Sequence, residues 1–101
     1  MRRGDLIAYE PVLATRPGVS RLRLIVSSDA VNDADLAVVL GLPVTPSDRG
    51  GLFSVRIGDH GWVSALSLEA VLRSRLGEVV GHAADDELQE VGIALRAAQD
   101  L

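Results

Sequence analysis

The sequence lacks cysteine and lysine entirely, and only three of its 101 residues are aromatic. Without cysteine, neither a disulfide framework nor a thiolate metal site can form. The two histidines, His60 and His82, fall in a predicted hairpin turn and at the end of a predicted strand, so no metal-binding spacing is present. We therefore expect a protein without a metal or any other cofactor.

No apolar run approaches the roughly 20 residues that a membrane-spanning helix needs. The first residues are not followed by the apolar stretch and small-residue cleavage site of a signal peptide. Hydrophobic residues nevertheless make up 48% of the chain, which argues against disorder and suffices for one core. We expect a single cytoplasmic domain over residues 1–101 that makes no membrane contact.

Charge is unevenly distributed along the chain. The formal net charge is −4, which argues against a protein that binds nucleic acid by charge alone. Residues 1–28 nevertheless hold five arginines against two acids, a local charge of +3, whereas residues 29–101 carry −7. These arginines are either solvated side chains on a sheet or an anion site, because steering depends on local potential rather than on net charge.

The hydrophobic pattern predicts a series of short strands. Residues 21–28 alternate in polarity, which predicts a strand with one buried face. Residues 36–42 form an almost continuous aliphatic run, which is typical of a strand covered on both sides. The other expected elements are strands at 5–10, 52–57, 62–65 and 78–82, a hairpin turn at 58–61 and a long loop at 11–20.

Two helices are also expected. Ser67 can cap a short helix that carries Glu69 in its first turn. The clearer helix covers residues 84–101, because acids occupy its first turn and apolar residues recur at spacings of three and four. Its apolar stripe consists of Leu88, Val91, Leu95 and Ala98. Gly92 inside this helix costs about 1 kcal/mol relative to alanine, a cost that close approach of another backbone would explain.

Few residues in the chain carry chemistry. There is no glycine-rich phosphate loop with its lysine and no serine in a nucleophile-elbow context. What remains is a polar set of arginines and hydroxyls: Arg21, Arg23, Ser27, Thr45 and Ser47. A guanidinium can bind two phosphate oxygens at once, so this set suits a phosphodiester, although arginine on a strand is also an ordinary surface residue.

Four segments resemble motifs of the MazF/PemK toxin family. Residues 2–7 (RRGDLI) are similar to the family's first strand. Residues 21–32 (RLRLIVSSDAVN) resemble its second motif, an Arg-Pro followed by an aliphatic strand, a serine and a downstream asparagine. Residues 42–45 (LPVT) resemble its third motif, and residues 75–81 (RLGEVVG) precede a helix as in the family. The motifs are short, and the resemblance lies in their shared order and spacing over nearly the whole chain.

The resemblance implies a fold and an activity. The fold is mainly β with α, a small SH3-like curled β-barrel with a C-terminal helix, and it forms a homodimer. The activity is that of a toxin in a toxin–antitoxin system. Such a toxin is an endoribonuclease (mRNA interferase) that cleaves single-stranded RNA at short sequences without a metal and is inhibited by a cognate antitoxin.

The resemblance also implies roles for individual residues. Arg21 matches the family's catalytic arginine and Thr45 its catalytic threonine. The implied reaction is attack of a ribose 2′-hydroxyl on its own phosphate, during which the protein stabilises charge on the phosphorane. The loop at 11–20 lies where the family closes over RNA. The residues expected to bind RNA are Arg16, Arg23, Ser27 and Ser47.

Two alternatives stay open at this point. Residues 57–62 (IGDHGW) resemble a segment of CcdB, a sister family with the same architecture that poisons DNA gyrase by binding it. The present chain ends in QDL, however, where CcdB ends in Trp-Gly-Ile. The other alternative is a non-catalytic member that only binds its antitoxin, because Leu22 stands where MazF/PemK toxins have proline and Pro46 where they often have serine.

Overall fold

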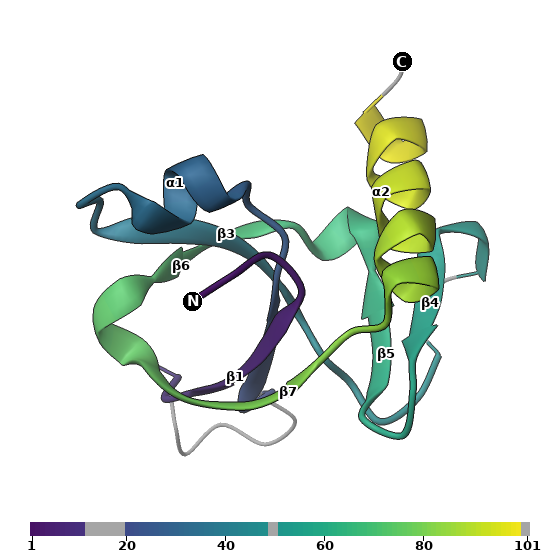
Figure 1. Cartoon of the computed structure of the whole chain (residues 1–101). Coiled ribbons are helices and arrows are strands. Elements are labelled where there is room, and N and C mark those ends of the chain that lie inside the picture. The colour runs from purple at the N-terminus through teal and green to yellow at the C-terminus, as the bar shows by residue number, and fades with distance from the viewer. Residues whose placement is uncertain (12–19, 49–50, 100–101) are drawn as a thin grey trace.

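The computed structural model describes residues 1–11, 20–48 and 51–99. A curled antiparallel sheet forms one side of the molecule, and a two-stranded hairpin with the C-terminal helix packs beside it (Figure 1). This arrangement confirms the expected fold class, mainly β with a C-terminal helix.

The elements are short. The strands are β1 (Asp5–Tyr9), β2 (Leu22–Ile25), β3 (Val38–Pro43), β4 (Ser54–Ile57), β5 (Gly61–Ser64), β6 (Glu69–Leu72) and β7 (Leu76–His82). The helices are α1 (Asp29–Asp33) and α2 (Asp85–Gln99), with 3-10 turns η1 (Gly51–Phe53), η2 (Ala65–Ser67) and η3 (Arg73–Arg75).

The larger sheet has the strand order β6-β3-β2-β1-β7, and β4 pairs with β5 in the second sheet. Every pairing is antiparallel. The sheet curls so that its two edge strands approach through the turn η3, which joins them in the chain (Figure 1). Within the described residues β6 and β7 do not pair, so the sheet is a curled, open form of the expected barrel.

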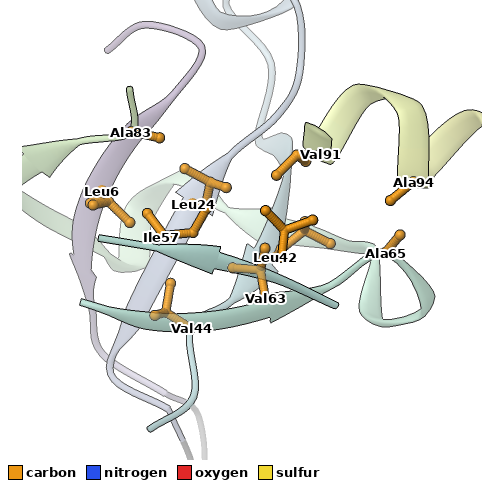
Figure 2. Packing of buried hydrophobic residues seen from close by; sticks show 11 residues of the cluster. Leu6, Leu24, Leu42, Val44, Ile57, Val63, Ala65, Ala83, Val91 and Ala94 are labelled. Carbon is orange, nitrogen blue, oxygen red and sulfur yellow. The ribbon is translucent and has the colours of Figure 1, made fainter. Parts of the chain in front are cut away.

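Two hydrophobic clusters cover the two faces of the curled sheet. The main core joins Leu6, Leu24 and Leu42 of the sheet to residues of β4, β5 and α2, as Figure 2 shows. The second cluster lies on the opposite face and consists of Ile7, Ile25, Val39 and Val71. Neighbouring residues of one strand therefore enter different cores, as the period of two in a β-strand requires.

The strand covered on both sides is β2 rather than β3. Leu24 and Ile25 are both 0% exposed and enter opposite cores. In β3, Leu42 is fully buried, but Val38 and Leu40 on the same side are 37% and 42% exposed. The layer formed by β4, β5 and α2 therefore reaches only one end of β3, and the prediction of a doubly covered strand at 36–42 was wrong.

The segment after Ser67 is the strand β6, where the sequence predicts a short helix. Val71 lies opposite Val39 in the β3 ladder and is 1% exposed. Burial of this side chain and the ladder hydrogen bonds outweigh the local helix signal, since propensity is a weak prior against tertiary pairing. The prediction failed because it used only neighbours in the chain.

Asp5 ties the first strand to the last. It is buried opposite His82 in the β1–β7 register. Its carboxylate accepts a hydrogen bond of 2.8 Å from the Arg2 N–H and lies 2.9 Å from His82 Nδ1. Burial raises the pKa of Asp5, but the hydrogen bonds from His82 and Arg2 outweigh it, so the pKa lies below its ordinary value. The group is therefore a carboxylate at neutral pH.

Helix α2 is fixed to the hairpin at its first turn. Glu87 accepts hydrogen bonds from the Ala84 N–H at 2.8 Å and from the Gly58 N–H in the β4–β5 turn at 2.6 Å. The helix buries Val91 and Ala94 in the main core. Among the described residues, no helix has the length and apolarity that crossing a membrane requires.

The G92A substitution is expected to stabilise the protein. A Cβ at Gly92 would meet no backbone, and the nearest atom would be a guanidinium nitrogen of Arg3 at 3.6 Å. Alanine therefore fits, and it recovers about 0.5–1 kcal/mol of helix propensity. Urea unfolding should show a higher midpoint with an unchanged m-value, whereas a lower midpoint would mean that the site is tighter than its contacts indicate.

Candidate active site at the ends of β2 and β3

The two predicted catalytic residues lie just beyond the paired ends of β2 and β3. Arg23 pairs with Pro43 and Leu24 with Leu42. The ladder continues one step, because the Val44 N–H donates to the Leu22 carbonyl at 3.0 Å. Arg21 precedes Leu22 and Thr45 follows Val44. The two residues therefore lie at the same end of this strand pair, although they are 24 positions apart in the sequence.

Arg21 is an exposed side chain over the larger of two cavities that described residues near the ends of β2 and β3 line. Its side chain is 58% exposed, and its Nη1 lies 3.8 Å from Oε2 of Glu10. The cavity beside it has a volume of about 420 Å³. It is lined by Ala8, Tyr9, Glu10, Arg21, Ser74, Arg75, Leu76 and Gly77, from the end of β1 and the start of β7. Arg75 adds a second guanidinium to this cavity.

Thr45 lies half-buried at the edge of the smaller cavity. Its backbone forms an isolated bridge with Trp62, with two hydrogen bonds of 2.8 Å. Its hydroxyl donates to the Ser47 carbonyl at 3.0 Å. The cavity has a volume of about 240 Å³. It is lined by Ser20, Arg23, Pro43, Thr45, Trp62, Val63, Ser64 and Ser67.

The two cavities are neighbours. Arg23 lines the smaller one and Tyr9 the larger one, and the guanidinium carbon of Arg23 lies 4.1 Å from the centre of the Tyr9 ring. This contact joins the linings of the two cavities. A ligand that uses both Arg21 and Thr45 must therefore extend from one cavity to the other.

The residues predicted to bind RNA differ in their exposure. Ser47 is exposed beside Thr45. Ser27 is buried, and its hydroxyl lies between Asn32 and the Leu40 N–H, so it is unavailable to a ligand. Arg23 is also buried and bonded within the protein. Arg16 lies outside the described residues.

Acidic side chains neutralise much of the cationic N-terminal quarter. Arg2 lies 3.8 Å from Asp29, Arg21 lies 3.8 Å from Glu10, and Arg23 lies 2.6 Å from Glu69. Asp29 also accepts a hydrogen bond from the Arg3 N–H. This hydrogen bond is the main reason that the pKa of Asp29 lies below its ordinary value. These pairs reduce the positive charge of the quarter, and among the paired arginines Arg21 has an exposed side chain that also lines a cavity.

Sequence reasoning missed four residues that shape the two cavities: Tyr9, Ser20, Trp62 and Arg75. Ser20 directly precedes the predicted strand at 21–28 and Tyr9 lies inside the predicted strand at 5–10, but their partners are distant in the chain, so no local signal marks them. Trp62 is the single tryptophan of the chain, which was the available clue. In the described part of the chain, no cluster of acidic and histidine side chains could hold a metal ion.

Comparison with known proteins identifies the family. A family model described as the PemK-like, MazF-like toxin of type II toxin–antitoxin systems matches residues 2–98. No match was found among curated proteins.

The fold is shared with solved structures along the whole chain. An endoribonuclease in complex with its cognate antitoxin, from a mycobacterial species, is 25% identical with a TM-score of 0.83, covering 100% of this chain and 96% of that one. MazF from Deinococcus radiodurans is 25% identical with a TM-score of 0.80, covering 100% and 97%. The findings favour the MazF/PemK interpretation over the CcdB alternative. The chain therefore belongs to the family of PemK-like, MazF-like toxins of type II toxin–antitoxin systems.

Proposed function

We propose that this protein, a single toxin domain over residues 1–101, is a metal-independent endoribonuclease that cleaves single-stranded RNA at short sequences. The observation that carries the proposal is the β2–β3 register, because Arg21 and Thr45 follow its paired residues at the same end, each beside a cavity. The relatives named as endoribonucleases, one of them bound to its antitoxin, support it. The protein acts as a homodimer that a cognate antitoxin inhibits.

The reaction uses the nucleophile that RNA itself supplies. The ribose 2′-oxygen forms a bond to phosphorus, and the bond to the 5′-oxygen breaks, leaving a cyclic phosphate and a free 5′-hydroxyl. Negative charge accumulates on the phosphorane oxygens, where preorganised donors stabilise it most. Arg21 donates two hydrogen bonds to these oxygens, and the Thr45 hydroxyl turns from the Ser47 carbonyl to donate a third.

Proton transfer falls to groups other than Arg21. A guanidinium stays protonated in proteins. Glu10 lines the same cavity, 3.8 Å from Arg21, and its exposed carboxylate can accept the proton of the 2′-hydroxyl. The leaving 5′-oxygen takes a proton from water, and the hydroxide that remains takes the proton from Glu10. Arg21 therefore acts by charge and geometry, and Glu10 by proton transfer.

The two departures from the family motif leave this arrangement intact. The Leu22 side chain packs against the main core. Pro46 is exposed and follows Thr45 without displacing its hydroxyl from the cavity edge. These positions supply packing and chain direction, so the proposal does not require the family's proline and serine there.

Gly61 sets the position of Thr45. It has a φ of +137°, which side chains other than glycine's rarely allow. A Cβ at this position would collide with the Thr45 carbonyl oxygen. The absence of a side chain therefore lets the β4–β5 hairpin approach closely enough for Trp62 to bridge to Thr45.

The purified protein is expected to cleave long single-stranded RNA in the presence of EDTA, because the nucleophile is the 2′-hydroxyl. R21A should lower the cleavage rate by about 10²–10³-fold, as loss of a transition-state donor does, with little change in melting temperature because the side chain is exposed. R56A removes another exposed arginine, from β4, and should cleave like the parent.

Several outcomes would contradict this assignment. Failure of the freshly folded parent protein to cut any long RNA would contradict the activity. Undiminished cleavage by R21A would contradict the site. Growth inhibition that survives R21A while cellular RNA stays intact would favour the gyrase-binding alternative.

The G61A substitution is expected to impair cleavage through Thr45. The strained backbone and the collision with the Thr45 carbonyl should cost about 2 kcal/mol of stability and shift the hydroxyl from its place. The matched control is G92A, the same chemical change where there is room. Gel assays below the melting temperature of both variants should show slower cleavage only for G61A, and equal rates would mean that Thr45 tolerates displacement.

A further inference from the structure

Arg23 is an unusual residue for the middle of a buried strand. It lies in β2, two positions after Arg21, and its side chain is 7% exposed. A buried charge is costly unless it is paired and fully hydrogen-bonded. Its contacts therefore indicate what it does.

The guanidinium binds the backbone on both sides of Arg21. Nη1 of Arg23 donates to the Ser20 carbonyl at 2.9 Å and to the Leu22 carbonyl at 3.2 Å. These carbonyls belong to the residues immediately before and after Arg21. One charged nitrogen thus restrains the peptide group that precedes Arg21 and the peptide group that follows Leu22.

Arg23 is itself held from two other strands. Its Nε donates to Oε1 of Glu69 on β6 at 2.6 Å, and the Tyr9 ring of β1 lies against its guanidinium. The strand β3 lies between β2 and β6, and there Gly41 is opposite Glu69. A Cβ at Gly41 would lie 2.9 Å from a methyl group of Val71 and 3.2 Å from the Leu24 carbonyl oxygen, so the close packing of β3 at this point favours glycine.

The same network reaches the Thr45 segment through Ser20. The Ser20 hydroxyl donates to the Val44 carbonyl at 2.6 Å and accepts from the Leu22 N–H at 3.2 Å. It therefore replaces a ladder hydrogen bond between β2 and β3 at the point where the strands end. The chain of contacts runs from Glu69 through Arg23 and Ser20 to the residue before Thr45.

We propose that Arg23 is a positioning residue, which with Ser20 and Glu69 fixes the backbone that carries Arg21 and Thr45. The inference rests on the proposed function, in which those two residues stabilise the phosphorane. It differs from the sequence-based expectation that Arg23 binds RNA directly. If Arg23 is a positioning residue, its replacement lowers kcat. If Arg23 instead contacts a phosphate directly, its replacement lowers the affinity for RNA and weakens the salt dependence of binding.

The experiment compares R23M, which keeps an unbranched side chain without the donors of the guanidinium, with R96M, which removes an exposed arginine from α2. R23M should lower kcat by about 10- to 100-fold, since small misplacement of a reacting group has effects of that size, with little change in KM. Binding of an all-2′-deoxy oligonucleotide should keep the salt dependence of the parent. R96M should match the parent in kcat, KM and salt dependence.

A second variant guards against misfolding of R23M. S20A leaves the charge pair of Arg23 and Glu69 in place but removes the hydroxyl that bridges to Val44. It should also lower kcat more than it changes KM. Unchanged kcat in folded S20A and R23M would overturn the inference. A decrease of about one in the slope of log affinity against log salt concentration for R23M would also overturn it, because such a decrease marks a lost phosphate contact.

Amide hydrogen exchange provides a readout that does not depend on activity. The Tyr9 N–H donates to the Arg21 carbonyl at 2.9 Å, and the Val44 N–H donates to the Leu22 carbonyl. Both amides should exchange faster in R23M and S20A than in the parent and in R96M. Unchanged exchange would overturn the inference. A parent protein that cleaves no RNA would overturn the proposed function alone, since exchange still measures whether Arg23 holds this backbone.

Discussion

Antiparallel hydrogen bonds between β2 and β3 determine which side chains of the two strands face each other, and the proposed site depends on that register. A slip of one residue would move Arg21 away from Thr45 and turn every β2 side chain to the other face. The two cores prevent such a slip, because Leu24 and Ile25 are fully buried on opposite faces. Hydrophobic packing in the middle of the strand thus sets the geometry of polar residues at its end.

Charge in this protein is organised by pairs rather than by its net value. The acidic remainder of the chain supplies partners for the arginines of the N-terminal quarter, including Glu69 for Arg23. Arg21 keeps an exposed side chain with Glu10 nearby, and Arg75 lines the same cavity. The resulting site is cationic over a small area, which suits the phosphate at one cleavage point rather than a long stretch of RNA backbone.

Sequence alone predicted the elements whose signals are local. The hairpin turn at 58–61, the strand β1 and the helix α2 all follow from composition and periodicity, and the motifs singled out Arg21 and Thr45. The strand β6 and the burial of Arg23 were not predictable in this way, because each depends on a partner far away in the chain: Val39 for β6 and Glu69 for Arg23. The burial of Ser27 was not predicted for the same reason, because its hydroxyl accepts a hydrogen bond from the N–H of Leu40, thirteen residues away.

The central claim is that Arg21 and Thr45, although they line adjoining cavities, act together on one phosphate. A double-mutant cycle on kcat/KM with R21A, T45A and the double variant tests it directly. If both residues stabilise the same phosphorane, the losses are not additive, and the double variant is about as inactive as the worse single variant. If the double variant instead loses the product of the two single effects, the residues act independently, and the site described here is not one catalytic unit.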